Sequence, residues 1–407
     1  MGRNGQGAFV IMHQTEGLDG AWSKTYAIEG GKHYRFRVDR KTVNVKSPRL
    51  SALVKITWQD DAGKDVPYDH PVVDYYRQGG VSMARPEYPI TERKLDDGWT
   101  EVSDVYRAPA KATRAVVDLH LKWAGAGGQI EYSGVSLAET KPPPSRRVRL
   151  ATVHYRPRGG KTPADNCRLF GPLIEDAARQ KADLVVLGET LTYYGLGKDY
   201  AAVAEPVPGP STEYFGALAK KHNLYIVAGL LERDKRLVYN VAVLIGPDGK
   251  VEGKYRKVCL PRSEAEGGIA PGNDYPVFKT RFGKVGMMVC YDGFFPEPAR
   301  ELTKRGAEVI AWPVWGCNPL LARARATENH VYLISSTYTD LETNWIISGV
   351  YDHTGEAIAK AKRWGEVVVA EVDLNQRTHW SGIGDFKAEM HRRRPVAVGK
   401  EPMEKAK

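Results

Sequence analysis

The chain has 407 residues, 42% of them hydrophobic and 27% charged, which describes an ordinary globular protein with room for two domains. Its net charge of +10 comes from basic residues spread along the sequence, so we expect a solvated surface and no nucleic-acid partner. No apolar run approaches the ~18 residues that span a bilayer, so we expect no membrane partner.

The N-terminal sequence and the cysteines bear on the compartment. MGRNGQGAF lacks the apolar core of a signal peptide, which favours a cytoplasmic location, with export after removal of a leader as the alternative. The cysteines Cys167, Cys259, Cys290 and Cys317 form no CxxC pair, so we expect neither a disulfide framework nor a zinc site. Free thiols suit a reducing compartment.

The first part of the chain alternates apolar and polar residues in short stretches. Turn signals rich in glycine and aspartate separate these stretches. The clearest alternating stretches are residues 33–38, 53–58 and 115–123. This pattern predicts an all-β sandwich over residues 1–140.

The composition changes at residues 141–147. Pro142, Pro143 and Pro144 favour an extended spacer. We therefore place a linker at 141–147 and a second domain, with a C-terminal tail, at 148–407.

The second domain alternates strands and helices, which predicts a layered α/β or α+β fold. The expected strands are 148–153, 184–187, 224–229, 238–245, 285–289, 309–312 and 331–335. The expected helices are 162–180, 211–222, 298–305 and 320–329.

Three segments of this domain are apolar strands that end in a reactive group. The carboxylate of Glu189, the ammonium of Lys257 and the thiol of Cys290 stand at these ends, and functional sites collect where strands end in α/β sheets. A carboxylate can deprotonate a thiol for attack on a carbonyl carbon. An ammonium can stabilise the resulting oxyanion, and the backbone N–H of Tyr291 is a second candidate donor.

Each of these residues also has an ordinary interpretation. A lone buried cysteine is usually an inert core thiol. Glu189 alone is compatible with a charge at a strand end, and Lys257 with a surface ion pair. The prediction of catalysis therefore depends on the three together.

The segments GETLTYYG, YRKVCLP and VCYDGFFPEPAR resemble, in order and spacing, the three signature segments of the nitrilase superfamily, the carbon–nitrogen hydrolases. The resemblance runs from about residue 148 to 394. It implies Glu189 as general base, Lys257 as oxyanion stabiliser and Cys290 as nucleophile that forms a thioester. It also implies a four-layer α-β-β-α sandwich, a homo-oligomer of two or more chains, and no cofactor or metal.

Many members of this superfamily have a second glutamate between the lysine and the cysteine. Glu264 and Glu266 both qualify, and we favour Glu266 because Gly267 and a later Pro-Gly pair follow it. Cys259 stands where the family often has histidine, and we interpret it as a packing residue.

Aromatic residues near the predicted site are candidates for the substrate pocket. Tyr193 and Tyr194 follow the predicted base, and Trp315 follows the strand after the nucleophile. Packing against a neighbouring loop is the alternative for all three.

The N-terminal domain resembles jelly-roll modules of the carbohydrate-binding type in residues 22–26, 31–36 and 128–137. A glycan that stacks on Trp22, Trp58 or Trp99 is one expectation for a partner. A scaffold is the other, and we favour it because aromatic residues on alternating strands usually belong to the core.

The sequence thus predicts a thiol-dependent amidase or N-carbamoyl hydrolase that acts on a small amide or carbamoyl substrate. Nitrile hydrolysis and amide transfer would use the same three residues. A glycan-binding protein with a vestigial hydrolase domain is a further alternative. The intact Glu189, Lys257 and Cys290 argue against it.

Overall fold

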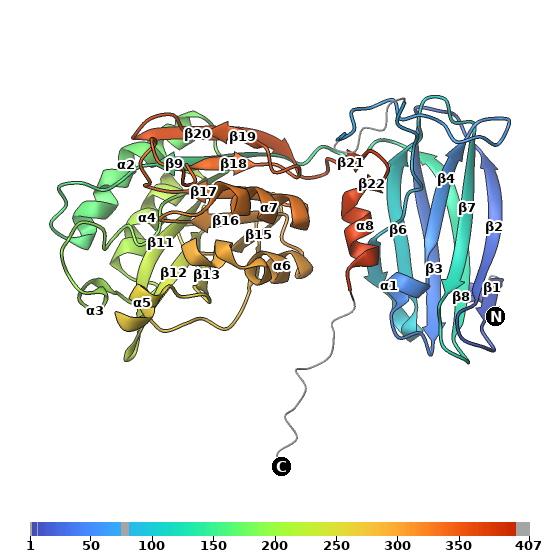
Figure 1. Ribbon diagram of the computed structural model, residues 1–407, viewed down its shortest axis with the longest axis horizontal. Helices are drawn as coiled ribbons and strands as arrows, with labels where there is room; N and C mark the ends of the chain where they lie inside the picture. The colour runs from blue at the N-terminus through green and yellow to red at the C-terminus, as the bar shows by residue number, and fades with distance from the viewer. Residues whose placement is uncertain (1, 6, 75–80, 396–407) are drawn as a thin grey trace, which may run out of the picture. The chain divides into compact units, whose positions relative to one another are not determined.

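The structure is a computed structural model that describes residues 2–5, 7–74 and 81–395 (Figure 1). The chain forms two compact units, which are described separately. Unit 1 comprises residues 1–144 and 377–407, and unit 2 comprises residues 145–376. The first boundary falls inside the predicted linker.

The C-terminal segment differs from the sequence prediction, which assigned it to the second domain. From Arg377 onward the chain belongs to unit 1. Arg377 pairs there with Asp104, and His379 lies 3.2 Å from Glu87. Long-range ion pairs therefore hold this segment to unit 1, while residues 396–407 of the predicted tail lie outside the described part of the chain.

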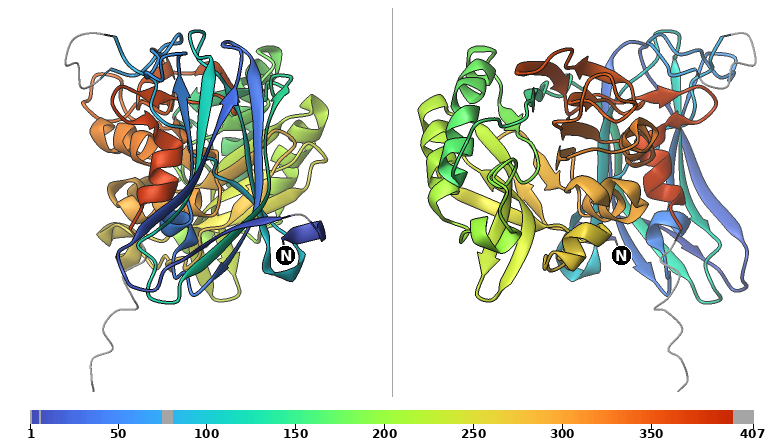
Figure 2. Two further views of the ribbon diagram at one scale, coloured as in Figure 1. Left: turned by 90° about the vertical axis from the view of Figure 1, so that its right-hand side faces the viewer. Right: turned by 60° about the vertical axis from the view of Figure 1, so that its left-hand side comes forward.

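The described part of unit 1 contains two larger antiparallel sheets, whose strands run beside one another in Figure 2, and a small two-stranded one. The larger sheet has the order β1 (Ala8–Met12), β8 (Gln129–Thr140), β3 (His33–Val43), β6 (Thr100–Arg107) and β5 (Thr91–Lys94). The smaller has the order β2 (Asp19–Ala27), β7 (Arg114–Lys122) and β4 (Val54–Gln59). The short helix α1 (Pro48–Ser51), strands β21 (His379–Trp380) and β22 (Gly384–Asp385), and helix α8 (Phe386–Arg393) complete it.

The alternating sequence of these strands places one face in the core. In β4, Val54, Ile56 and Trp58 are buried while the residues between them are partly exposed. Trp58 and Trp99 are only 2% and 6% exposed, whereas Trp22 is 47% exposed. Of the three tryptophans considered for glycan stacking, Trp58 and Trp99 are therefore core residues.

Unit 2 is built on two six-stranded sheets. The first has the order β13 (Val251–Arg256), β12 (Leu237–Ile245), β11 (Tyr225–Asp234), β10 (Leu184–Val186), β9 (Arg147–His154) and β20 (Glu366–Asp373). The second has the order β14 (Val277–Lys279), β15 (Lys284–Met287), β16 (Val309–Pro313), β17 (Tyr332–Ser336), β18 (Gly349–Tyr351) and β19 (Ala357–Lys360). Strands β9, β10 and β11 are parallel, as are β15, β16 and β17.

Helices cover the two sheets. Helix α2 (Pro163–Arg179) begins with a capping box between Thr162 and Asp165 and buries Phe170 and Ile174, spaced as on one helical face. It packs with α4 (Pro210–His222) on the first sheet, whereas α6 (Pro296–Lys304) and α7 (Pro319–Asn329) contact strands of the second. The predicted α/β class and its helices are confirmed.

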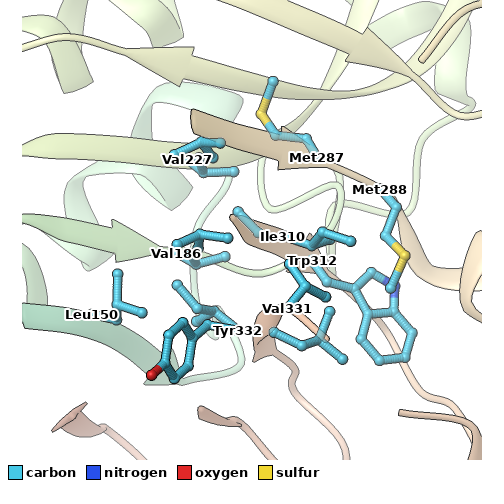
Figure 3. Close-up of a cluster of buried hydrophobic side chains, with 14 of the residues drawn as sticks. Leu150, Val186, Val227, Met287, Met288, Ile310, Trp312, Val331 and Tyr332 are labelled. Carbon is cyan, nitrogen blue, oxygen red and sulfur yellow. The ribbon is translucent and has the colours of Figure 1, made fainter. Parts of the chain in front are cut away.

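A hydrophobic core joins the two sheets. Figure 3 shows Leu150, Val186 and Val227 of the first sheet near Met287 and Ile310 of the second. All five are fully buried. The sheets therefore pack through their apolar side chains, and the ends of strands from both meet at the edge of this layer. No helix within the described ranges is long and apolar enough to cross a bilayer.

Candidate active site

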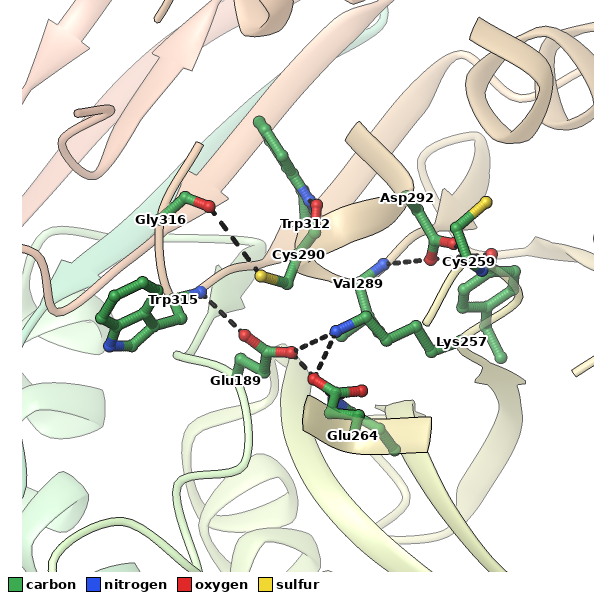
Figure 4. A network of polar contacts seen from close by, with 12 residues as sticks. Glu189, Lys257, Cys259, Glu264, Val289, Cys290, Asp292, Trp312, Trp315 and Gly316 are labelled. Atoms are coloured by element: carbon green, nitrogen blue, oxygen red, sulfur yellow. Dashed lines mark hydrogen bonds and ion pairs between the residues drawn. The ribbon is translucent and has the colours of Figure 1, made fainter. Parts of the chain in front are cut away.

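Glu189, Lys257 and Cys290 come together in unit 2. Glu189 follows β10 and Lys257 follows β13, so both belong to the first sheet, while Cys290 follows β15 of the second. Lys257 Nζ lies 2.9 Å from Glu189 Oε1. Figure 4 shows the carboxylate, the ammonium and the thiol converging on one region. The three residues are 3%, 0% and 8% exposed, in that order.

The turn that carries the thiol has an unusual backbone. Cys290 begins the short 3₁₀ helix η3 (Cys290–Phe294) with φ of +40°, a region that residues other than glycine rarely adopt and that is often found at functional sites. The indole N–H of Trp312 donates to the Cys290 carbonyl oxygen at 3.2 Å. A Cβ on Gly293 would lie 2.2 Å from Trp312 Cζ2, so this turn requires glycine beside the indole.

Asp292 holds the same turn from the inside. Its carboxylate is fully buried and accepts hydrogen bonds from the backbone N–H groups of Val289 and Cys259 at 2.9 and 2.8 Å. The Tyr255 hydroxyl donates to it at 2.9 Å. Since Cys259 lies two residues after Lys257, Asp292 connects the turn that carries Cys290 to the segment that carries Lys257.

The carboxylate of Glu189 has three donors. Oε1 accepts from Lys257 Nζ and from Asn240 Nδ2 at 2.8 Å, and Oε2 accepts from the backbone N–H of Trp315 at 2.8 Å. Three donors fix the orientation of a carboxylate that would otherwise rotate. Asn240 was missed by sequence reasoning, although a lone amide within the apolar strand YNVAVLI is a signal.

The second glutamate beside Lys257 is Glu264, which corrects the preference for Glu266. Glu264 Oε1 lies 2.6 Å from Lys257 Nζ, whereas the Glu266 side chain is 64% exposed and pairs with Arg262. Both glutamates lie in the short helix α5 (Arg262–Glu266). Residues two positions apart in a helix point in nearly opposite directions, so only one of them can face the lysine.

The charges around the site set its resting protonation. Burial raises the pKa of the Cys290 thiol, Glu189 raises it further, and Lys257 opposes them without reversing the direction. Burial acts to lower the pKa of Lys257, but Glu189 and the other acidic groups outweigh it and raise that pKa above its usual value. Burial and the nearby Glu189 raise the pKa of Glu264. The resting site therefore holds a charged lysine and a neutral thiol.

The remaining predicted residues lie at several places around this centre. The backbone N–H of Tyr291 stands in the first turn of η3, where N–H groups have no partner within the helix. Trp315 contacts Glu189 through its backbone. The ring of Tyr194 lies 4.8 Å from that of Tyr338, and the ring of Tyr193 lies 4.6 Å from that of Tyr200.

Two tyrosines that sequence reasoning missed border the site. Burial, followed by the charge of Glu189, raises the pKa of Tyr338 well above its usual value, and this phenol hydrogen-bonds the Thr190 side chain. Tyr200 interacts electrostatically with Glu264 and Glu189, and burial raises its pKa to about 12. Both phenols are therefore neutral. Tyr338 comes from a loop without a periodic pattern, which gave no signal in the sequence.

Cys259 is half-buried beside Asp292, and burial raises the pKa of its thiol to about 12. It remains a packing residue in our interpretation. Within the described ranges, no three His, Cys, Asp or Glu side chains are grouped so that they could hold a metal ion.

Comparisons with known proteins identify the family of unit 2. The family model for carbon–nitrogen hydrolases matches residues 149–381. The omega-amidase NIT2 of Danio rerio is 34% identical in an alignment of 254 residues that covers 56% of this chain and 89% of that protein. A nitrilase of Pyrococcus abyssi is 37% identical in an alignment of 239 residues that covers 56% of this chain and 90% of that protein.

A solved structure is also similar. Saccharomyces cerevisiae Nit3, a member of branch 10 of the nitrilase superfamily, superposes with a TM-score of 0.51 at 26% identity, covering 63% of this chain and 96% of that one. The family match spans more than half of the 407 residues and includes Glu189, Lys257 and Cys290. The chain therefore belongs to the carbon–nitrogen hydrolases of the nitrilase superfamily.

Proposed function

We propose that this protein hydrolyses the carbon–nitrogen bond of a linear amide or an N-carbamoyl compound through a thioester on Cys290. The observation that carries the proposal is the 2.9 Å pair of Glu189 and Lys257 beside a buried thiol on a turn with positive φ. A base, a cation and a nucleophile held by two packed sheets form a preorganised site for acyl transfer.

In the first half-reaction, Glu189 accepts the proton of the Cys290 thiol as sulfur attacks the carbonyl carbon. The negative charge on the carbonyl oxygen is stabilised by the Lys257 ammonium and the Tyr291 N–H. Protonated Glu189 then gives its proton to the nitrogen, the carbon–nitrogen bond breaks, and ammonia or an amine leaves. The acyl group remains on sulfur as a thioester.

In the second half-reaction, Glu189 accepts a proton from water as the water oxygen attacks the thioester carbon. The tetrahedral intermediate collapses with loss of the sulfur, which recovers the proton from Glu189, and the acid is released. Glu264 lies 2.6 Å from Lys257, and we propose that this second carboxylate keeps the lysine charged and in place through both steps.

Related chemistry on the same residues gives the alternatives. Relatives that match the chain include proteins named omega-amidase and nitrilase. Nitrile hydrolysis or amide transfer would use the same three residues and a covalent intermediate on Cys290. We rank amide hydrolysis first. We also propose that unit 2 is the four-layer α-β-β-α sandwich of the family and that unit 1 is a jelly-roll scaffold, since its Trp58 and Trp99 are buried.

The test is release of ammonia or amine from a panel of aliphatic and aromatic amides, N-carbamoyl amino acids and matching nitriles. Cys290→Ala should abolish release, and the acylated wild-type enzyme should show the acyl mass on the peptide that contains Cys290. Cys167→Ala is the matched control, because Cys167 is a buried thiol on α2 that contacts Ser211. Full activity of Cys290→Ala would contradict the proposal.

A further inference from the structure

A row of aromatic rings adjoins the reactive groups. Its members are Tyr291, Phe294, Phe295, Trp315 and Trp345, here called the aromatic row. Ring centroids lie 5.0 Å apart for Tyr291 and Phe294, and 5.3 Å apart for Tyr291 and Phe295. They lie 6.3 Å apart for Phe294 and Trp345, and 6.0 Å apart for Trp345 and Trp315. The row is therefore continuous.

Two members of the row adjoin the proposed catalytic groups. Tyr291 follows the nucleophile Cys290, and the backbone N–H of Trp315 binds Glu189 at 2.8 Å. The ring of Trp345 packs on Gly316, whose carbonyl oxygen lies 3.9 Å from the Cys290 sulfur. A Cβ on Gly316 would lie 2.8 Å from Trp345 Cε3, so glycine allows this close approach.

The rings are too exposed to serve packing alone. Trp315 is 54% exposed, Trp345 39% and Phe295 38%. The backbone beside Trp345 is nevertheless anchored, because the next residue, Ile346, donates its backbone N–H to the Cys317 carbonyl at 2.8 Å. Held aromatic faces open to solvent beside a nucleophile are typical of a site that binds an apolar part of a ligand.

The charges near the row disfavour an acidic ligand. None of the described lysine or arginine side chains lies over a ring of the row, although Arg256 and Arg156 lie over other rings of unit 2. Lys257 is fully buried and paired with two carboxylates. Arg325, behind the turn, is buried and donates to the carbonyls of Gly293 and Phe294 and to Glu328.

We propose that the aromatic row binds an uncharged aromatic or bulky apolar substituent of the substrate, so that the preferred substrates are aryl-substituted amides and those with a carboxylate tail are poor. The proposal rests on the proposed function, because it places the substituent next to the carbon that Cys290 attacks. The substituent can enter on the acyl side or on the nitrogen side of the amide, and the experiment separates the two.

The test compares matched amides. On the acyl side, 3-phenylpropanamide, propanamide and succinamate differ only in a phenyl, a hydrogen or a carboxylate at one carbon. On the nitrogen side, N-(2-phenylethyl)acetamide is compared with N-ethylacetamide. In at least one arm, kcat/KM should be about tenfold or more higher for the phenyl compound, as expected for burial of a ring. Succinamate at or above 3-phenylpropanamide, with no phenyl preference in the nitrogen arm, would overturn the proposal.

Variants connect the preference to the row. Trp345→Ala should reduce the ratio of kcat/KM between the phenyl and unsubstituted compounds about tenfold, mainly through KM, and Trp345→Phe should restore part of it. Trp364→Ala is the control, because Trp364 is 36% exposed but stacks on His154 and has no ring contact with the row among the described residues. An unchanged ratio in Trp345→Ala would contradict the proposal even with normal hydrolysis.

A binding measurement separates this inference from the proposed function. Full-length Cys290→Ala is titrated by calorimetry with the phenyl compound of each arm and with succinamate. Tighter binding of either phenyl compound, lost in the Cys290→Ala/Trp345→Ala double variant, supports the aromatic row even if no amide of the panel is hydrolysed. Equal or tighter binding of succinamate than of both phenyl compounds overturns it, whether or not the wild-type protein hydrolyses amides.

Discussion

The hydroxyl of Tyr255 donates a 2.9 Å hydrogen bond to the carboxylate of Asp292, in the interior of unit 2. Tyr255 lies in β13, the strand before Lys257, and Asp292 lies in η3, the turn that carries Cys290 after a strand of the other sheet. This bond therefore couples the two segments that carry Lys257 and Cys290.

We expect Asp292→Asn to disturb this coupling. The side-chain amide of the variant would place an NH₂ group where a carboxylate oxygen now accepts hydrogen bonds, so two donors would face each other. This should cost about 1–3 kcal/mol of unfolding free energy and reduce kcat. Tyr255→Phe removes a single hydrogen bond and should cost about 1 kcal/mol. Urea unfolding and kcat measure both effects, and equal losses in the two variants would argue against a positioning role for Asp292.

Lys257→Met should separate stability from catalysis. Removal of the buried ammonium leaves Glu189 and Glu264 facing each other, which should cost about 3–5 kcal/mol, and kcat should fall about 10²–10³-fold with loss of an oxyanion donor. Adding Glu264→Gln removes one of the two carboxylates, so stability should partly return while turnover stays low. Recovery of turnover in the double variant would show that Lys257 acts only structurally.

Glu264 and Glu266 form a natural matched pair. Glu264→Gln should lower kcat about tenfold or more, because its carboxylate contacts Lys257, the proposed oxyanion stabiliser. Glu266→Gln should change kcat less than twofold, since that side chain is exposed and pairs only with Arg262 among the contacts of the described chain. Steady-state kinetics of the two variants on one amide test this prediction. A larger loss of kcat in Glu266→Gln than in Glu264→Gln would favour Glu266 as the second glutamate.

Unit 1 should show a pH-dependent stability through His379. Burial acts to lower the pKa of this imidazole, but the hydrogen bond and charge of Glu87 outweigh it and raise that pKa above 6.5. A raised pKa means that the stabilisation is fully present below the unfolded value of about 6.5 and is lost as pH rises through the folded value. The difference in Tm between the wild type and His379→Gln should therefore shrink above about pH 6.5.

The neighbouring His70 should give a pH dependence of stability of the opposite sign, in a separate pH range. His70 lies 3.1 Å from His379, and burial together with that neighbour lowers its pKa below 6.5. The contribution of His70 to the free energy of unfolding is therefore lost as the pH falls, and not as the pH rises. Glu87→Gln serves as the control for the pH range above about 6.5. If the Tm difference between the wild type and His379→Gln grew with pH above 6.5, it would contradict the assignment of this pH dependence to His379.

Sequence reasoning was most successful where the information is local. The strands that lead to Glu189 and Cys290 could be predicted because each is a short apolar run that ends abruptly. Strand β13, which leads to Lys257, has the largely polar sequence VEGKYR and was not among the expected strands. The choice between Glu264 and Glu266 depended on which face of α5 meets the lysine, and a five-residue helix carries too little periodicity to reveal that.

Long-range contacts explain the other differences. Residues from Arg377 onward belong to unit 1 because of pairs such as Arg377 with Asp104, which are far apart in sequence. Trp58 lies on the stretch 53–58, whose alternation was visible in the sequence, but which face of that strand is buried depends on the facing sheet. Trp345 and Tyr338 come from a loop, and the sequence offers no rule that places a loop beside a strand end.

The origin of Glu189 and Cys290 on different sheets gives the hydrophobic layer a second role. Stacked sheets lie about 10 Å apart, at a spacing set by the side chains between them. Val186 and Ile310, which belong to this core, therefore act as spacers between the sheets that lead to Glu189 and Cys290. Under the proposed mechanism, a change of one methylene in the core should alter the distance over which the proton moves, so we expect the reaction rate to depend partly on residues that never meet the substrate.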